Sequence, residues 1–302
     1  MMSEGYDKER IDALRKEVFA NNYDYSEFGY WFFKSLRETN PSRAYALRIG
    51  DAIYDIFDKS TPVIREGELI VGRNFVWKPS PEEEAEWKLL REYGNRIYPA
   101  LHGQGDHMAI DYDLLLNRGA LGIMEDIKKR RAALDLTLIP NIEKDNFYAC
   151  CLRSLEGLIR FSERYAEEAE RQAASCASPQ RKAELLRIAE ITRKVPANPA
   201  GGFYEAVQST HFTTFALSAK PFACGVRQFQ LGRPDRYLWK FYEADLKAGK
   251  IKPEEAQTLV DCLAICINNR VPSGLSSGYM VGGRDKTGAL VSNDLTRMLI
   301  KA

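Results

Sequence analysis

The chain has 302 residues, of which 45% are hydrophobic and 28% are charged, and its 43 basic and 42 acidic residues leave a formal net charge of +1. This length suffices for one large core or two smaller ones, while the balanced charge gives no electrostatic argument for binding nucleic acid or a membrane surface. No apolar run approaches the roughly 18 residues of a membrane span, and the six cysteines form no C-x-x-C pair, so we expect a reduced, cytoplasmic protein without a zinc ribbon.

The first third of the chain is predicted to be mostly helical. Apolar residues at helical spacing indicate helices over 8–19 and 27–36. Asn40-Pro41 is expected to begin a third helix, because proline is well tolerated at the first helical position. The run 63–72 has two short apolar stretches around a Glu-Gly turn, which is typical of a hairpin or ribbon.

Four helices are predicted for the middle of the chain. The capping box Ser80-Pro81-Glu82-Glu83 begins the first of them. Asp111 is expected to cap the second, with Leu114 and Leu115 turned inward. A long amphipathic helix over 146–174 and an antiparallel partner over 178–194 follow, and a proline-rich break then leads to the last third.

The stretch 201–246 is predicted to lie inside a large α/β body. An apolar helix over 203–217 is followed by a short buried strand around Phe229 and by a helix that carries aromatic residues on three sides, which indicates nearly complete burial. We expect the rest to form a helix over 252–269, a strand-turn element over 278–290 and a final helix over 293–300. The helix-rich part (about 1–200) and the strand-bearing part (about 201–302) are expected to pack as one unit.

The segment HGQGDH at 102–107 is the strongest local candidate for a binding site. Its glycines let the backbone approach a ligand closely, and Gln104, Asp106 and His107 supply hydrogen-bond donors and acceptors. Two alternatives stay open: a metal site, for which two histidines without further ordered ligands are a weak pattern, or a polar turn that caps the next helix. The glycines do not follow a clear strand, which argues against a dinucleotide fingerprint.

Polar residues within the apolar stretch form a second candidate. His211 lies among phenylalanines, where a histidine is either a hydrogen-bonded core residue or a catalytic one. Gln228 and Gln230 would share one face of a strand. Two amides on a buried face indicate a polar cavity, since an unpaired buried amide costs about 1–3 kcal/mol.

Two charged turns are interpreted as structural. Arg233 and Asp235 are expected to pair with each other and to fix the turn after the strand. The run 282–288 lacks the G-x-x-x-x-G-K-[ST] pattern of a phosphate loop, and its part from Asp285 to Gly288 is typical of a turn. No G-x-S-x-G elbow occurs either.

Four blocks follow one another along the chain. They are EGELIVG at 66–72, GDH with DYxxLLxxGxxGI at 105–123, FYEAxQS with LGRPDRYL and FYxxDL at 203–246, and GGxDxxG with NDLT at 282–296. Each block alone is unspecific. In this order they resemble the glycyl radical enzymes of the pyruvate formate-lyase and glycerol dehydratase type, and the resemblance covers nearly the whole chain.

This resemblance implies a ten-stranded α/β barrel wrapped in helices, of which the chain would form the N-terminal part. In that family a glycyl radical on a C-terminal loop acts through a cysteine at the barrel centre, whose thiyl radical abstracts hydrogen from the substrate. The chain has neither a C-x-E-P-like cysteine loop nor an R-V-x-G-Y-like radical loop, so both are expected outside it, and Cys224, Cys262 and Cys266 are not assigned that role. The chain would then belong to a lyase, dehydratase or decarboxylase as a fragment or split gene product, or be an inactive scaffold or binding protein.

The resemblance also implies that this chain contributes to the substrate pocket. The residues predicted to bind a small polar substrate are Gln104, Asp106, His107, His211, Gln228 and Gln230. The two glutamines near position 229 stand where dehydratase-like members carry a serine, which argues against glycerol or choline. No metal or bound cofactor is expected. The expected partners are the C-terminal remainder of the enzyme and a radical S-adenosylmethionine activating enzyme that installs the radical, and the resemblance also allows a homodimer.

Overall fold

The computed structural model describes residues 5–20, 26–73, 75–97, 106–218, 227–269 and 278–302. Within these ranges the chain forms twelve helices and two short strands, so the predicted helix-rich fold is confirmed. No helix in the described part of the chain is long and apolar enough to cross a membrane.

Four helices form the first part of the chain. They are α1 (Lys8–Ala20), α2 (Ser26–Glu38), α3 (Tyr45–Lys59) and α4 (Pro81–Ile97). The predicted start of α3 at Asn40-Pro41 is wrong, because the Asn40 side chain accepts a hydrogen bond from the Ser42 amide at 2.9 Å, and this local turn competes with helix formation. The capping box of α4 is confirmed, since Ser80 Oγ accepts from the Glu83 amide at 3.2 Å and Glu83 Oε2 accepts from the Ser80 amide at 2.7 Å.

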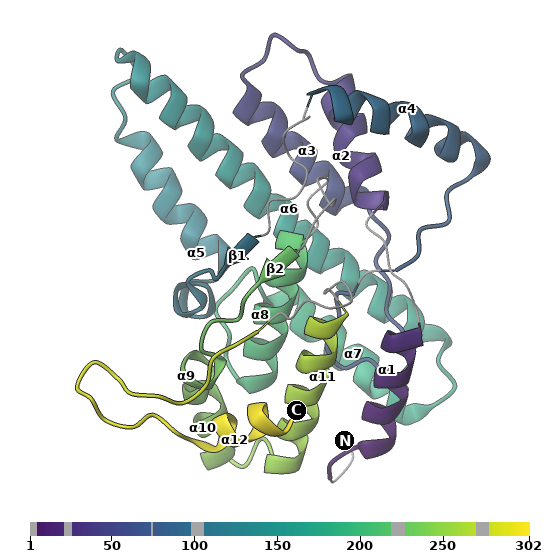
Figure 1. Cartoon of the computed structure of the whole chain (residues 1–302), viewed down its shortest axis with the longest axis vertical. Coiled ribbons are helices and arrows are strands. Elements are labelled where there is room, and N and C mark those ends of the chain that lie inside the picture. Colours follow the sequence, from purple (N-terminus) through teal and green to yellow (C-terminus); the bar gives the residue numbers. More distant parts are fainter. Residues whose placement is uncertain (1–4, 21–25, 74, 98–105, 219–226, 270–277) are drawn as a thin grey trace.

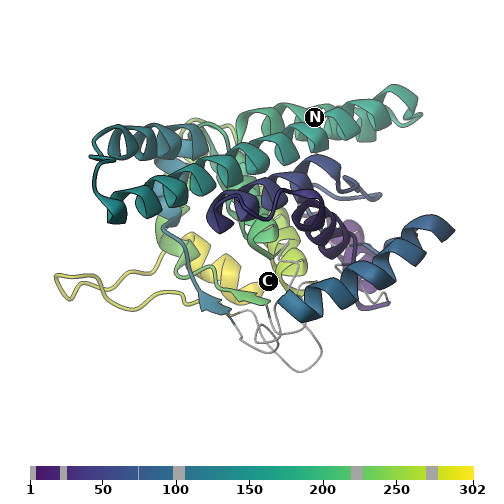
Figure 2. The ribbon, with the colours of Figure 1, turned by 90° about the horizontal axis from the view of Figure 1, so that it is seen from above.

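Three long helices form the middle of the chain. They are α5 (Tyr112–Ala132), α6 (Ile139–Ser175) and α7 (Pro179–Lys194). In Figure 1, α5 runs beside the first half of α6 and α7 beside its second half, and Figure 2 shows these helices along one side of the molecule. Asp111 caps α5 as predicted, accepting from the Leu114 amide at 2.9 Å. The Leu114 side chain, which was expected to point inward, is 43% exposed, because Leu115 and Leu116 occupy the buried face.

Helix α5 is kinked at Gly119, whose backbone leaves the helical region at φ 63° and ψ 172°. The segment that follows α7 fills the kink. The backbone amides of the next two residues of α5 donate to the carbonyl oxygens of Pro196 and Ala197, at 2.8 and 3.0 Å. Glycine is required here, because a Cβ atom at this position would lie 2.4 Å from the Ala197 oxygen.

Helix α8 (Phe203–Ser218) is the centre of the molecule, and fourteen of its sixteen residues are buried. Its first half packs in one hydrophobic core with α1, α11 (Pro253–Asn268) and α12 (Asp294–Lys301), and its second half packs in another with α2, α3 and α6. Figure 1 shows α8 between these two groups of helices. The fold therefore has two cores that share one helix.

The predicted aromatic helix after the central strand is two short helices, α9 (Pro234–Tyr237) and α10 (Trp239–Lys247). Tyr237 and Tyr242 are buried, at 7% and 0% exposure. Trp239 and Phe241 are only half-buried, so the prediction of nearly complete burial is wrong. One face of α10 packs against α8, and the opposite face lies at the surface.

The two strands, β1 (Asp106–Met108) and β2 (Arg227–Phe229), lie side by side and run parallel. Their register pairs Asp106 with Arg227, His107 with Gln228 and Met108 with Phe229. For these strands the structure describes the course and the pairing of the backbone. The ten-stranded barrel stays a prediction, since the described residues contain this one parallel pair.

The hairpin predicted over 63–72 is wrong. The expected turn is present at Gly67, with φ 76°, but the residues on either side of it form no strand in the part of the chain that the structure describes. Residues 69–72 instead lie along α8, where side chains of that helix take the hydrogen bonds that a partner strand would have made.

Candidate functional site

The parallel pair of strands joins two of the sequence-predicted site segments. Its register sets His107 directly beside Gln228, although the two residues are far apart in the sequence, and Asp106 is the next residue on β1. Gln104 lies outside the described residues. The carbonyl oxygen of Gln230, just after β2, accepts a hydrogen bond from the Tyr112 hydroxyl at 2.9 Å. The backbone therefore brings His107 and Gln228 together at one edge, as a shared binding site requires.

His211 lies on α8 and is fully buried, with 0% exposure. Its Nε2 atom lies 2.7 Å from the carbonyl oxygen of Gly72. This hydrogen-bond contact joins His211 to the backbone of the segment 69–72. Its role in binding substrate stays a prediction.

The same helix holds the rest of that segment. The Gln208 side chain accepts a hydrogen bond from the Val71 amide at 2.9 Å and donates one to the Val71 carbonyl at 2.8 Å. The Tyr204 hydroxyl donates to the Leu69 carbonyl oxygen. Both side chains are buried, as is that of His211. Because buried backbone groups need partners, these contacts explain why an extended segment is stable here without a neighbouring strand.

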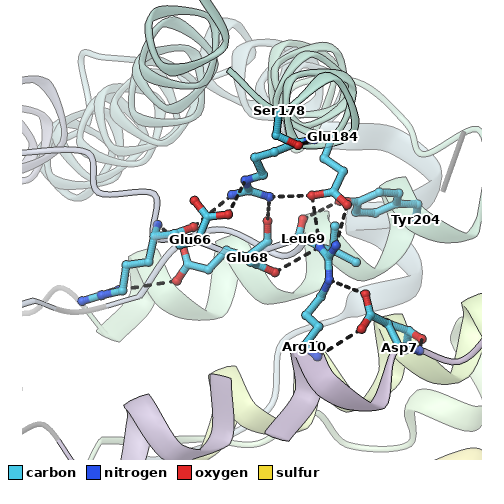
Figure 3. A network of polar contacts seen from close by, with 12 residues as sticks. Asp7, Arg10, Glu66, Glu68, Leu69, Ser178, Glu184 and Tyr204 are labelled. Atoms are coloured by element: carbon cyan, nitrogen blue, oxygen red, sulfur yellow. Dashed lines mark hydrogen bonds and ion pairs between the residues drawn. The ribbon is translucent and has the colours of Figure 1, made fainter. Parts of the chain in front are cut away.

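Ion pairs fix the other side of this segment (Figure 3). Arg181 donates from Nη1 to the Glu68 carbonyl oxygen at 2.8 Å and to Glu184 Oε2 at 2.9 Å. Arg10 donates to Glu184 from both terminal nitrogens and from Nε to Asp7 at 2.9 Å. The network links α1 and α7 to the turn that precedes residue 69.

Two buried charges of this network, Glu184 and Arg10, stay ionised. Burial alone would raise the pKa of Glu184, but hydrogen bonds from Arg10 and Arg181 bring the pKa below its ordinary value. Burial likewise opposes the charge of Arg10, yet Glu184 and Asp7 raise the pKa of its guanidinium. Both groups are therefore charged at neutral pH and act as fixed partners, which suits a structural role better than proton transfer.

The turn after β2 is anchored to the Gly-Gly turn near the end of the chain. Arg233 and Asp235 were predicted to pair with each other, but both bind Gly282 instead. Arg233 Nη1 donates to the Gly282 carbonyl oxygen at 2.9 Å, and Asp235 Oδ2 accepts from the Gly282 amide at 2.6 Å. Asp235 Oδ2 also accepts from the Thr296 hydroxyl at 2.8 Å, and Asn293 donates to the Asp235 carbonyl oxygen at 2.8 Å. The two charged residues are structural, as expected, but they join two turns rather than pairing within one.

The cysteines of α11 are poor candidates for redox or nucleophilic chemistry. Cys262 and Cys266 are 2% and 3% exposed, and burial raises the pKa of the Cys262 thiol well above its ordinary value. Cys224 lies outside the described residues. Among the residues that the structure describes, no group of three or more histidine, cysteine, aspartate or glutamate side chains is arranged to hold a metal ion.

Comparison with known proteins gives curated relatives that the chain matches over part of their length. The isethionate sulfite-lyase of Bilophila wadsworthia is 32% identical over 207 residues, which cover 64% of this chain and 25% of that protein. The indoleacetate decarboxylase of Tractidigestivibacter scatoligenes is 33% identical over 218 residues, which cover 66% and 24%. The chain thus spans about a quarter of the length of the curated relatives it matches.

Solved structures share the fold over nearly the whole chain. The structure described for 1,2-propanediol dehydration in Roseburia inulinivorans matches with a TM-score of 0.86 and 22% identity, over 99% of this chain and 46% of that one. The glycerol-bound B12-independent glycerol dehydratase of Clostridium butyricum matches with a TM-score of 0.84 and 24% identity, over the same shares. The family described as pyruvate formate lyase-like matches residues 84–302. The chain therefore belongs to the pyruvate formate lyase-like family.

Proposed function

We propose that this chain is the substrate-binding N-terminal part of a glycyl radical lyase, dehydratase or decarboxylase that acts on a small polar metabolite. One observation carries the proposal: the parallel pairing of β1 with β2 brings His107 and Gln228, from two separate family blocks, to the same place. The relatives' names support the substrate class, since they include isethionate sulfite-lyase and the trans-4-hydroxy-L-proline dehydratase of Clostridioides difficile.

In this proposal the residues of the chain bind and orient the substrate. His107 and Asp106 on β1, with Gln228 on β2, Gln230 and Gln104, would form hydrogen bonds to its hydroxyl and anionic groups. The glycyl radical, on polypeptide outside this chain and installed by a radical S-adenosylmethionine activating enzyme, would supply hydrogen-atom abstraction through a cysteine. The buried thiols of α11 do not fit that cysteine, and in this proposal it lies on the complementary polypeptide, the C-terminal remainder of the enzyme.

His211 would act on the site through the backbone. Its contact with Gly72 fixes the segment 69–72 beside α8, and α8 also contacts β2. A change at His211 is therefore expected to affect the position of β2 as well as any contact with substrate. The proposed ten-stranded barrel would place β1 and β2 as neighbouring strands of its first half.

The test uses the intact protein together with its activating enzyme. The organic radical is measured by electron paramagnetic resonance, and turnover is then followed with small hydroxylated and sulfonated metabolites. His107→Ala and Gln228→Leu should lower kcat/KM by about 10- to 100-fold, as expected for the loss of a substrate hydrogen bond. Lys286→Ala, in the exposed turn at 285–288, is the control and should leave kcat/KM unchanged.

Two outcomes would count against the proposal. Full activity of both site variants would show that the β1–β2 edge does not bind substrate. An intact protein that acquires no radical and turns over no candidate would support the alternative function, an inactive scaffold or binding protein that keeps this half of the fold.

A further inference from the structure

A cavity of about 690 Å³ lies among the helices on the other side of α8 from the segment 69–72. Its walls come from α2, α3, α5, α6 and the end of α8, and include Ile53, Leu115 and Leu155. This volume falls within the range of small-molecule sites, roughly 300–1,000 Å³. Most of the wall is apolar, so the cavity favours an apolar occupant.

The polar atoms of the wall can be accounted for individually. Asp111, the one ionisable residue among the described residues of the wall, accepts from the Leu114 amide as the cap of α5. Ser154 Oγ donates to the Cys150 carbonyl oxygen at 2.9 Å. Thr213 differs from both, because its buried Oγ1 atom has no hydrogen-bond partner and the residue is only 7% exposed.

The neighbouring threonine shows that the helix could have satisfied this hydroxyl. Thr214 Oγ1 donates to the carbonyl oxygen of His211 at 2.7 Å and lies 3.1 Å from that of Thr210. Thr213, one residue earlier, lines the cavity instead. A buried hydroxyl without a partner is unfavourable, and an oxygen atom of a bound molecule would supply the missing hydrogen bond.

We propose that this cavity binds a small, uncharged molecule with an apolar body and one oxygen that pairs with the Thr213 hydroxyl. The apolar wall, with no cation in its described part, disfavours a charged ligand, which would lose its hydration without gaining a partner. The Thr213 hydroxyl is buried from solvent, so an occupant has to displace neighbouring side-chain atoms to reach it, which a slender molecule does more easily than the surface of a second protein. The proposal does not depend on the proposed radical chemistry, and it assigns the cavity a ligand distinct from the substrate.

The test is isothermal titration of the intact protein with 1-octanol, which has an apolar chain and one hydroxyl, and with octanoate as the charged comparison. We expect octanol to bind and octanoate to bind at least tenfold more weakly. Thr213→Val, which keeps the shape of the side chain, should weaken octanol binding about 3- to 10-fold, the effect of one hydrogen bond. Thr214→Val is the matched control and should leave the affinity unchanged, because that hydroxyl binds its own helix.

A second variant tests the location independently. Ala216→Phe places a ring into the cavity and should abolish octanol binding, while circular dichroism confirms that the variant is folded. The proposal would be overturned by the absence of octanol binding to the unmodified protein, by equal losses in the two threonine variants, or by octanoate binding as tightly as octanol. Sedimentation that shows self-association through this face, lost in Ala216→Phe, would assign the cavity to a second copy and would also overturn it.

Discussion

Replacing Gly119 by alanine is predicted to be among the most damaging single-methyl changes in this chain. The backbone there, at φ 63° and ψ 172°, lies in a region that is essentially restricted to glycine. The position also joins α5 to the segment after α7, through hydrogen bonds of 2.8 and 3.0 Å to the Pro196 and Ala197 oxygens and one of 3.0 Å from the Ala200 amide to the Leu116 oxygen. A side chain at this position would therefore strain the backbone of α5 and also weaken its hydrogen bonds to the segment after α7.

The magnitude follows from these two effects. Holding a residue other than glycine in this conformation costs about 1–3 kcal/mol. The added Cβ would also lie 2.4 Å from the Ala197 oxygen and 2.5 Å from the Asn198 carbonyl carbon, which are backbone atoms and cannot rotate away. Moving that segment would weaken hydrogen bonds worth about 0.5–1.5 kcal/mol each. We expect Gly119→Ala to lower the free energy of unfolding by about 3–5 kcal/mol.

Gly122→Ala is a matched control in the same helix. The Cβ atom it adds would meet mainly the Arg118 side chain, at 2.9 Å from Nε, and this long side chain can move. Alanine also favours a helix interior over glycine by about 0.5–1 kcal/mol. Urea denaturation followed by circular dichroism should therefore show a large loss for Gly119→Ala and a change within about 1 kcal/mol for Gly122→Ala. Equal free energies for the two variants would refute the assigned role of Gly119.

Three further predictions concern side-chain hydrogen bonds. Gln208→Met should lower the free energy of unfolding by about 2–4 kcal/mol, because it leaves the buried amide and carbonyl groups of Val71 without partners. The control Gln180→Met, at an exposed site on α7, should change the free energy of unfolding by less than about 0.5 kcal/mol. Comparable losses for the two variants in urea denaturation would contradict this prediction. Asp235→Ala should speed amide hydrogen exchange across 279–302 more than elsewhere, since that side chain anchors the Gly-Gly turn and α12, and unchanged exchange there would disprove the anchoring. The pKa of Glu86 is lowered from 4.5 to about 2, mainly by a hydrogen bond from Lys34. The stabilising effect of the ionised Glu86 is therefore present above about pH 4.5 and is lost as the pH falls toward 2. In urea titrations Glu86→Gln should flatten the pH dependence of the unfolding free energy in this range, and a curve parallel to that of the unmodified protein would argue against the prediction.

Much of the helical fold was predictable because its signals act over a few residues. Ser80, Asp111 and Ser178 each cap a helix where the sequence places one, since a cap and the amides it binds are three residues apart or closer. The hairpin prediction failed for the opposite reason. The partner of Val71 is the side chain of Gln208, 137 residues away, and nothing near position 71 identifies it.

The site was predictable in composition but not in geometry. The family blocks identified His107 and Gln228, whose backbone pairing the structure describes, while their contacts with a substrate stay predictions. Arg233 and Asp235 were correctly expected to be structural. Their common partner Gly282 lies almost fifty residues further along the chain, and a local pattern cannot reveal such a contact.

The contacts explain why the sequence blocks identify the family more firmly than the substrate. The block at 66–72 is bound by the block at 203–246, whose Tyr204 and Gln208 side chains hold the segment 69–72. The block at 203–246 is bound to the block at 282–296 through Asp235, and within the former the Asp245 carboxylate accepts a hydrogen bond from the Phe203 amide at 2.7 Å.

Residues that join elements in this way are required by the fold whatever molecule is bound, so matching them establishes the architecture. In the proposed function, the substrate is instead selected by side chains of the paired strands β1 and β2. For this reason we expect exchanges at His107 and Gln228 to change which metabolite is bound while the unfolding free energy changes little, and exchanges at Gln208 or Asp235 to do the reverse. Measuring metabolite binding and the unfolding free energy for all four variants distinguishes residues that hold the fold together from residues that bind the substrate.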